Sequence, residues 1–217
     1  MKYRTIYADP PWPIKWAHSA GIRTRHLDYQ TMPIAEICAL DVKSISEDDC
    51  NLFMWTTNQF LPESLWVVRH WGFNYEMLFT WCKNNGMGSH PRNATEHMVI
   101  ATRGTLSRGS RNDPMILNWL NHPIGAHSEK PRPIIDIIEK ISPAPRLEMF
   151  ARQYRLGWDV WGNQVESHVQ LRHLTPLTGA IAPDNQQVVL PADALVGEGT
   201  LPEPPTANGL VTAIKKI

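Results

Sequence analysis

Short apolar runs of strand length recur along the first 150 residues and alternate with helical patterns. Residues 2–8, rich in Tyr, Thr and Ile, predict a first strand that ends at the following Asp-Pro-Pro. Four later runs are almost continuously apolar, which is typical of strands covered on both faces of a sheet: 51–57, 76–83, 97–102 and 146–151.

Two stretches between these runs carry helical signals. Residues 61–71 have Pro62 near the start and Gly72 just past the end, the usual placement of these two residues around a helix. Residues 130–141 place four isoleucines on one face: Ile134, Ile137, Ile138 and Ile141. Strands that alternate with helices predict an α/β fold of three layers. Ligands of such sheets bind beyond the carboxyl ends of the strands.

Aromatic residues mark where the folded core ends. The 9 Trp, 5 Tyr and 5 Phe all lie at or before Trp161, and the last 50 residues, from His168 on, hold six prolines instead. Aromatic side chains supply much of the buried area of a core. We therefore predict a core domain over residues 1–167 and a tail over residues 168–217 that docks on the domain or stays partly disordered.

Charge and cysteine content narrow the class of protein. The 21 Lys+Arg balance the 21 Asp+Glu, which excludes binding to polyanions by bulk charge alone but leaves a local basic face open. No apolar run of about 18 residues or signal-peptide core is present, so we expect no membrane association. The three cysteines have no metal-ligand spacing, which predicts reduced thiols. No metal site is expected, because His90, His97, His122 and His127 lack that spacing too. These features predict a cytoplasmic protein.

The tetrapeptide Asp9-Pro10-Pro11-Trp12, at the end of the first predicted strand, is the leading candidate for chemistry. Its two prolines fix φ and remove two backbone donors. A carboxylate and a carbonyl then become rigid acceptors beside a flat indole. Two acceptors suit an exocyclic amine and an indole suits a stacked ring, so the set predicts recognition of adenine or cytosine. The alternative is a plain turn with Trp12 packed in the core.

These residues, with other segments in the same order, resemble the adenine N6-methyltransferase family that carries the DPPW signature. That family includes the eukaryotic messenger-RNA adenosine methyltransferases and their bacterial and phage DNA-acting relatives. The resemblance covers residues 3 to 166 and rests on YADPPW at 7–12, YQTM at 29–32, LFMWTT at 52–57, WGF at 71–73, TWCK at 80–83, EHMVIATRG at 96–104, KP at 130–131, LEMFAR at 147–152 and GNQ at 162–164. It implies a Rossmann-like methyltransferase fold with a mostly parallel sheet and permuted strand order, in which the target-amine strand comes first and the S-adenosylmethionine strand last.

The resemblance also implies a reaction, methyl transfer from S-adenosylmethionine to the N6 amine of adenine. Asp9 and the carbonyl of Pro10 would accept from the amine and favour the positive charge that grows on its nitrogen. Trp12, beyond Pro11, would stack on the base. Tyr29 would belong to a loop that closes over the base, or else be a loop aromatic that shields the core.

Further residues are assigned to the cofactor through the same resemblance. Lys130, which would open a helix just after a loop, would hold the methionine carboxylate, and Asp9 would also serve the methionine amine. Phe150 would line the pocket, and three side chains would hydrogen-bond the ribose and adenine: Arg152, Asn163 and Gln164. The alternatives are a solvated Lys130 and a simple turn at 163–164.

The chain departs from its RNA-acting relatives at two points. Ala151 stands where those members have Gly, so we expect the turn to open differently. Those members also grip the cofactor's adenine with residues well upstream of DPPW, whereas only eight residues precede Asp9 here. Another segment, with the tail as one candidate, would take that role, or else the pocket is more open.

Basic side chains predict contacts to a phosphate backbone, with an affinity that falls as salt rises. They lie in two stretches: Lys15, Arg23, Arg25 and His26, and then Arg103, Arg108 and Arg111. Lys83 and Arg92 would add to the rim, and Glu96 resembles the family's acidic residue at the base of a second active-site loop. The alternative in each case is a solvated, charged surface.

The sequence therefore predicts an S-adenosylmethionine-dependent adenine N6-methyltransferase of a bacterium or a phage-infected host cell. DNA is the favoured substrate because the chain is compact and carries no long RNA-binding extension. Adenosine in RNA, and a non-catalytic nucleic-acid-binding subunit with the same fold, are the alternatives. The sequence leaves the target sequence and the oligomeric state open, a dimer included.

Overall fold

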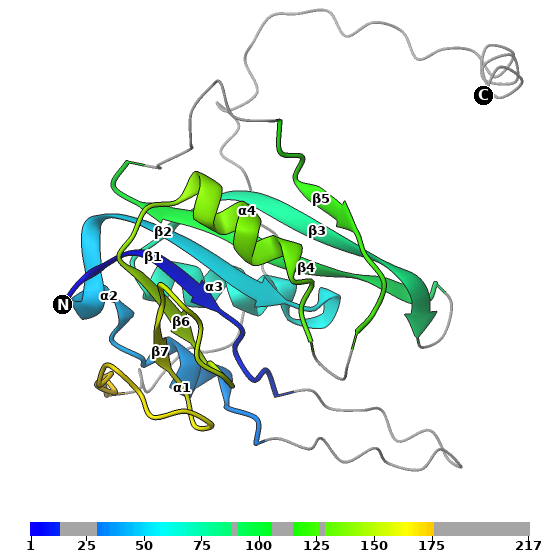
Figure 1. Ribbon diagram of the computed structural model, residues 1–217. Coiled ribbons are helices and arrows are strands. Elements are labelled where there is room, and N and C mark those ends of the chain that lie inside the picture. Colours follow the sequence, from blue (N-terminus) through cyan, green and yellow to red (C-terminus); the bar gives the residue numbers. More distant parts are fainter. Residues whose placement is uncertain (14–29, 88–90, 106–114, 126–128, 176–217) are drawn as a thin grey trace, which may run out of the picture. The chain divides into compact units, whose positions relative to one another are not determined.

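The computed structural model describes residues 1–13, 30–87, 91–105, 115–125 and 129–175 (Figure 1). The strands in this part are β1 (Tyr3–Ala8), β2 (Ser46–Thr56), β3 (Asn74–Met87), β4 (Asn93–Arg103), β5 (Trp119–Asn121), β6 (Arg146–Met149) and β7 (Asp159–Trp161). The helices are α1 (Ile34–Cys38), α2 (Val42–Ile45), the 3₁₀ turn η1 (Asn58–Phe60), α3 (Leu61–His70) and α4 (Pro133–Ile141). The strands form one sheet in the order β5-β3-β4-β2-β1-β6-β7.

The sheet is mostly parallel, as the family resemblance implies. Among the described strands only β4 runs the other way, antiparallel to both β2 and β3. The first strand of the chain, β1, is central and lies between β2 and β6, with Ile6 level with Leu52 on one side and Leu147 on the other. The first strand and the strand after α4 are therefore neighbours, in keeping with the permuted order.

Two apolar cores lie on opposite faces of the sheet. On β1, Ile6 packs in the core that contains Val67 of α3, whereas Tyr7 packs in the core that contains Ile134 of α4. Figure 1 shows α3 and α4 on opposite sides of the sheet. The near-continuous apolar runs thus have their expected cause, since every residue of a doubly covered strand meets a core. The prediction of a three-layer α/β fold is confirmed.

Some elements extend beyond the sequence predictions or lie outside them. β3 and β4 are both longer than their apolar runs because polar residues continue their pairing, for example Cys82 opposite Thr95. The short elements α1, α2 and β5 had no clear signal. α4 begins at Pro133, so Lys130 precedes the helix rather than opening it.

Residues 168–175, which we call the docked segment, run back along the domain. The backbone N–H of His168 donates to the carbonyl of Val160 at 2.9 Å, and that of Leu174 donates to Ala39 at 2.7 Å. His173 forms an antiparallel bridge with Leu40, just after α1. The division of the chain at residue 167 stays a prediction, and residues 176–217 of the predicted tail lie outside the described residues.

No helix in the described part of the chain is long and apolar enough to cross a membrane.

Candidate active site

The carboxyl ends of the central strands meet at one edge of the sheet. Ala8, the last residue of β1, is level with Met54 of β2 and Met149 of β6, and Met149 is level with Trp161 of β7. Asp9 and the turns after β6 and β7 therefore lie together at this edge. Because β4 is reversed, it brings its amino-terminal part, including Glu96, to the same place.

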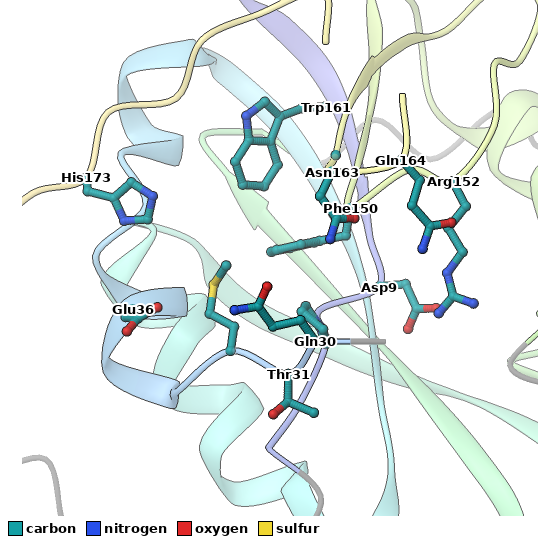
Figure 2. A pocket seen from close by; sticks show the side chains of 13 residues that line it. Asp9, Gln30, Thr31, Glu36, Phe150, Arg152, Trp161, Asn163, Gln164 and His173 are labelled. Carbon is teal, nitrogen blue, oxygen red and sulfur yellow. The ribbon is translucent and has the colours of Figure 1, made fainter. Parts of the chain in front are cut away.

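A cavity of about 340 Å³ lies at this edge (Figure 2). Its walls include most of the residues assigned to the cofactor from sequence, together with Pro11: Asp9, Phe150, Arg152, Asn163 and Gln164. The other lining residues were not predicted, and they are Gln30, Thr31, Met32, Glu36, Trp161, Gly162 and His173. Three of them belong to the YQTM segment and Gly162 belongs to the GNQ segment, but the sequence has no local signal for the remaining three.

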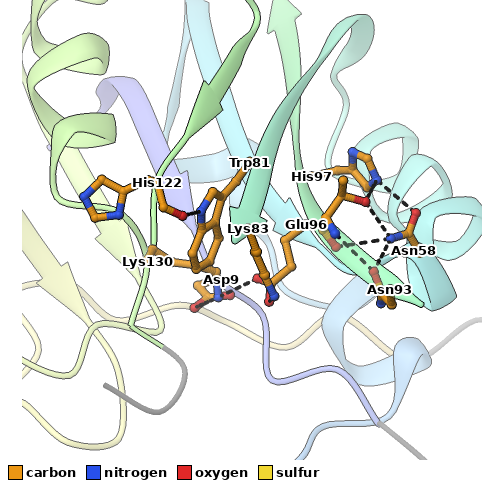
Figure 3. Close-up of polar contacts among 10 residues, drawn as sticks. Asp9, Asn58, Trp81, Lys83, Asn93, Glu96, His97, His122 and Lys130 are labelled. Carbon is orange, nitrogen blue, oxygen red and sulfur yellow. Dashed lines mark hydrogen bonds and ion pairs between the residues drawn. The ribbon is translucent and has the colours of Figure 1, made fainter. Parts of the chain in front are cut away.

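Asp9 belongs to a network of four charged side chains of alternating sign, which we call the four-charge network (Figure 3). Lys130 Nζ lies 2.8 Å from Asp9 Oδ2 and 3.6 Å from Glu96 Oε2, and Lys83 pairs with the other oxygen of Glu96. The four side chains are only 11% to 25% exposed, so water screens these pairs weakly. The network holds the Asp9 carboxylate in place at the cavity wall.

The electrostatic balance at Lys130 favours its charged form. Burial, the largest single influence, acts to lower the pKa of Lys130, but the carboxylates of Asp9 and Glu96 together outweigh it and leave the pKa above its ordinary value. The ammonium also lies 5.5 Å from the ring centre of Trp55, a favourable cation–π distance. Lys130 is therefore a fixed cation beside Asp9, and its expected role toward the methionine carboxylate stays a prediction.

Trp12 corrects one expectation. Its indole is only 4% exposed and stacks on Phe60, with ring centres 5.7 Å apart and planes 11° from parallel. The indole Nε1 donates to the carbonyl of Trp55 at 3.0 Å. The prediction that Trp12 offers a stacking face to a base is wrong in this structure, because the apolar ring and its N–H are both satisfied in the core. The alternative, a packed core residue, is the one observed.

Pro10 and Pro11 keep the turn rigid through their carbonyls. The carbonyl of Pro10 accepts from the N–H of Trp12 at 2.8 Å, and that of Pro11 accepts from the N–H of Met32 at 2.8 Å. A carbonyl oxygen has two lone pairs, so the Pro10 carbonyl keeps acceptor capacity for a second donor. The hydrogen bond from Met32 ties the turn to another residue that lines the cavity.

The turns after β6 and β7 are shaped by backbone geometry. Phe150 has φ of 61°, a left-handed conformation that is unusual for an aromatic residue, and its ring meets Trp161 edge to face at 5.3 Å. The N–H of Ala151 donates to the carbonyl of Trp161 at 3.0 Å. A Cβ on Gly162 would lie 2.8 Å from the backbone nitrogen of Ala151 and closer still to its carbonyl oxygen. Glycine is therefore needed at the start of GNQ to let the two turns touch.

Comparison with known proteins identifies the family. The family model named MT-A70 matches residues 3–164. The chain belongs to the MT-A70 family. This confirms the resemblance read from the DPPW-containing motifs.

Several curated proteins are similar to the chain. It is 36% identical over 185 residues to the type II methyltransferase M.MunI of Mycoplasma sp, covering 76% of this chain and 78% of that protein. It is 28% identical over 180 residues to the N(6)-adenosine-methyltransferase MT-A70-like protein of Drosophila melanogaster and 25% identical over 180 residues to the N(6)-adenosine-methyltransferase catalytic subunit METTL3 of Homo sapiens. The chain spans only 27% and 28% of the lengths of these two relatives.

Beside Glu96, this MT-A70 domain carries a buried histidine in a polar cluster (Figure 3). The amide nitrogen of Asn58 donates to Asn93, which leaves the Oδ1 of Asn58 as an acceptor. His97 Nε2 lies 3.0 Å from this Oδ1. His97 Nδ1 lies 3.1 Å from the hydroxyl of Thr80. Burial lowers the pKa of His97, against a weaker opposing effect of Glu96. The neutral ring therefore joins β4, β3 and η1 next to the four-charge network.

The basic residues of this MT-A70 domain fall in different places. Lys83 belongs to the four-charge network, and exposed Arg92 directly precedes β4, at the end that carries Glu96. Arg103 lies at the opposite end of β4, where it donates to the carbonyl of Lys43 at 3.1 Å. The reversal of β4 carries this end of the strand away from Asp9. The contact between Arg103 and a phosphate backbone stays a prediction, and it would lie outside the Asp9 edge of the sheet. Seven predicted residues lie outside the described part of the chain: Lys15, Arg23, Arg25, His26, Tyr29, Arg108 and Arg111.

Proposed function

We propose that this chain is an S-adenosylmethionine-dependent methyltransferase that acts on the N6 amine of adenine in DNA. The observation that carries the proposal is the position of Asp9. Its carboxylate stands on the wall of the cavity and is held there by Lys130. The cavity also contains Phe150 and the amide of Asn163, so one site combines an anchored acceptor with groups suited to a nucleoside.

The residues of the cavity fit S-adenosylmethionine in chemical type. A volume of about 340 Å³ falls in the range of about 300–1,000 Å³ that is usual for small-molecule sites. Asp9 would hold the ammonium group of the donor's methionine part. Lys130, which lies beside Asp9, would hold the carboxylate of that part. Arg152, Asn163 and Gln164 offer donors and acceptors for the ribose and purine, and Phe150 offers an apolar face.

The chain's residues act mainly by position and charge. S-adenosylmethionine, when bound, supplies a methyl group on a positively charged sulfur. Asp9 and the carbonyl of Pro10 accept N–H bonds from the target amine and stabilise the positive charge that develops on its nitrogen. Lys130 prevents the Asp9 carboxylate from rotating out of line. After transfer the nitrogen is cationic and acidic, and its proton leaves through the Asp9 carboxylate or water.

The target base has to leave the nucleic-acid stack to reach Asp9, at a cost of a few kcal/mol. Trp12 is packed against Phe60 and is not available for stacking. Lys130, which holds Asp9, also pairs with Glu96, and Glu96 pairs in turn with Lys83.

DNA is preferred because similarity to a type II methyltransferase extends over more than three quarters of both chains. RNA is the second candidate, because two relatives named as adenosine methyltransferases match the same share of this chain at lower identity. The presence of the paired Asp9 and Lys130 supports an enzyme rather than a non-catalytic subunit. A cytoplasmic setting in a bacterium or a phage-infected cell remains a prediction from the sequence.

One assay tests the proposal. Labelled S-adenosylmethionine is incubated with random-sequence pools of double-stranded DNA, single-stranded DNA and RNA, and the products are digested to nucleosides. We expect N6-methyldeoxyadenosine from DNA with the wild-type chain and almost none with Asp9→Asn. Product from RNA alone would overturn the choice of DNA. No product from any pool, together with no binding of S-adenosylmethionine in calorimetry, would favour the non-catalytic subunit.

A further inference from the structure

The ends of β3 and β4 form a ribbon that projects past the edge of the sheet that holds Asp9. β2 ends at Thr56, which is level with His97 of β4. The residues of β4 before His97, from Asn93 on, pair only with β3 among the described strands. Figure 1 shows the tip of β3 beyond the end of β2. A two-stranded ribbon of this kind is narrow enough to enter the major groove of DNA.

Asn93, on this ribbon, has its carboxamide held in one orientation. The backbone N–H of Thr95 donates to Asn93 Oδ1 at 3.3 Å, and Asn58 Nδ2 donates to the same oxygen at 2.8 Å. A carbonyl oxygen has two lone pairs, so both are engaged. Among the described residues nothing accepts from Asn93 Nδ2, and the side chain is exposed. Its two N–H groups are therefore presented outward.

The orientation of Asn58 is fixed in turn. Its Nδ2 lies 3.2 Å from the carbonyl of Thr95, which can only accept, and its Oδ1 lies 3.0 Å from Nε2 of buried His97. Figure 3 shows Asn58 between His97 and Asn93. Turning over either amide would set donor against donor or acceptor against acceptor, which costs the hydrogen bonds of the cluster. The buried part of the cluster thus determines which group Asn93 presents.

Asn93 lies at a suitable distance from the target base. It is three residues from Glu96, which pairs with the same Lys130 that holds Asp9. A strand rises about 3.3 Å per residue, so Asn93 lies about 10 Å further out along β4. Successive bases of DNA are about 3.4 Å apart. The offset therefore corresponds to a base within about three positions of the target adenine.

We propose that Asn93 recognises a base near the target adenine through its outward Nδ2, and that Asn58 positions it. This inference rests on the proposed function and adds to it a residue that selects the DNA sequence. A freely turning asparagine favours adenine, to which it both donates and accepts. Asn93 can only donate, because its oxygen is engaged. It therefore selects guanine or thymine, whose major-groove edges carry acceptors and no donor.

Sequencing of the methylated products tests this contact in the full chain. Each variant is incubated with S-adenosylmethionine and a random-sequence pool of double-stranded DNA, and the bases around each N6-methyladenine are counted. With the wild-type chain, we expect one position within about three bases of the target to favour guanine or thymine. Asn93→Asp keeps an oxygen toward Asn58 and Thr95 but presents an acceptor outward. At that position it should shift the preference by about tenfold toward cytosine or adenine, which carry donors.

Asn58→Asp tests the positioning without changing the residue that contacts the base. Its carboxylate still accepts from His97 but sets a second acceptor against Asn93 Oδ1, so the Asn93 carboxamide turns over and presents its oxygen outward. We expect a shift toward cytosine or adenine at the same position. Asn74→Asp is the matched control, because exposed Asn74 begins β3 at the end away from Asp9, and it should leave every preference unchanged. Each preference is a ratio within one variant, so a partly unfolded sample does not distort it.

The outcomes separate this inference from the proposed function. If the wild-type chain leaves no N6-methyladenine in the DNA pool, the proposed function fails, and the inference fails with it. If the wild-type chain methylates DNA but Asn93→Asp keeps every base preference, recognition of a base by Asn93 is overturned and the proposed function stands. A loss of DNA affinity with unchanged base preferences would likewise overturn it, since a phosphate oxygen would then be the acceptor opposite Asn93.

Discussion

The two halves of the site are held in place by different forces. The reaction half, around Asp9, is made of side chains that fix one another through ion pairs, with Lys130 between Asp9 and Glu96. The donor half, around Phe150 and Gly162, is made of two turns in close backbone contact. Changes of charge should therefore disturb the first half, and added methyl groups should disturb the second.

The largest effect is expected from Asp9→Asn. A neutral carboxamide cannot stabilise positive charge on the target nitrogen, so methyl transfer should fall by about 10²–10³-fold. The rate is measured with labelled S-adenosylmethionine, and Asp136→Asn is the control for loss of a carboxylate. Equal rates for Asp9→Asn and wild type would remove Asp9 from the reaction half. An accompanying loss of S-adenosylhomocysteine affinity would support the second role proposed for Asp9, which is to hold the ammonium group of the donor.

Next in size is the effect of Lys130→Met on stability. Without the cation, the mostly buried carboxylates of Asp9 and Glu96 repel each other, so we expect the free energy of unfolding to fall by about 2–3 kcal/mol at pH 7. Because the pKa of folded Lys130 is raised, its stabilising effect is present at neutral pH and is lost only as pH rises above about 10.5. Urea denaturation of this variant should therefore approach that of wild type in strong base. The exposed Lys140→Met is the control, and equal loss in both variants would contradict the role of the network.

The donor half is tested by Gly162→Ala. The added Cβ would press on the backbone of Ala151, which should cost about 1–3 kcal/mol of stability and weaken S-adenosylhomocysteine binding by displacing Asn163. Gly157→Ala is a useful contrast, because Gly157 has φ of 79° but no atom within 4 Å of an added Cβ. That change should cost about 1 kcal/mol through the backbone alone and leave binding unchanged. Unchanged binding in Gly162→Ala would show that the turn contact is not needed.

A smaller, pH-dependent effect is expected from His97 in the reaction half. Its pKa is lowered in the folded chain, so the unfolded chain takes up its proton first and stability falls as pH drops below about 6.5. The slope from one proton is at most about 1.4 kcal/mol per pH unit. His97→Gln should remove this part of the slope in urea midpoints measured between pH 7.5 and 5.5. Exposed His70→Gln is the control, and an unaltered slope in His97→Gln would refute the assignment.

The smallest effect separates the two ends of β4. Arg92→Gln should lower the slope of log affinity for DNA against log salt by about one, as expected for one lost phosphate contact. Arg103→Gln, at the far end of the strand, should leave that slope unchanged. Equal slopes for the two variants would mean that nucleic acid does not lie along the Asp9 edge.

Much of the fold was predictable because it depends on local patterns. The central strands are apolar on both faces, and the isoleucines of α4 lie at helical spacing with Ile134 and Ile138 buried. The ends of β3 and β4 were not predicted, because mostly polar residues extend these strands beyond their apolar runs. The short elements α1 and β5 carry too few residues for a period to be visible.

The candidate site was predictable where motifs carry it and not where packing does. Asp9, Phe150 and Asn163 were found through their motifs and line one cavity. Glu36 and His173 were missed because only the bridge between the docked segment and Leu40 brings them to the same wall. Trp12 was misassigned because the motif shows an indole but not Phe60, which covers it and which lies far along the chain.

The central position of β1 has a consequence for synthesis on the ribosome. Asp9 is synthesised long before the neighbouring strand β6 (Arg146–Met149) and the GNQ turn after β7. A nascent chain carries its acceptor carboxylate long before it has a wall to hold a methyl donor. Products of premature termination before residue 146 are therefore expected to be inert, so that translation itself keeps incomplete copies from modifying nucleic acid.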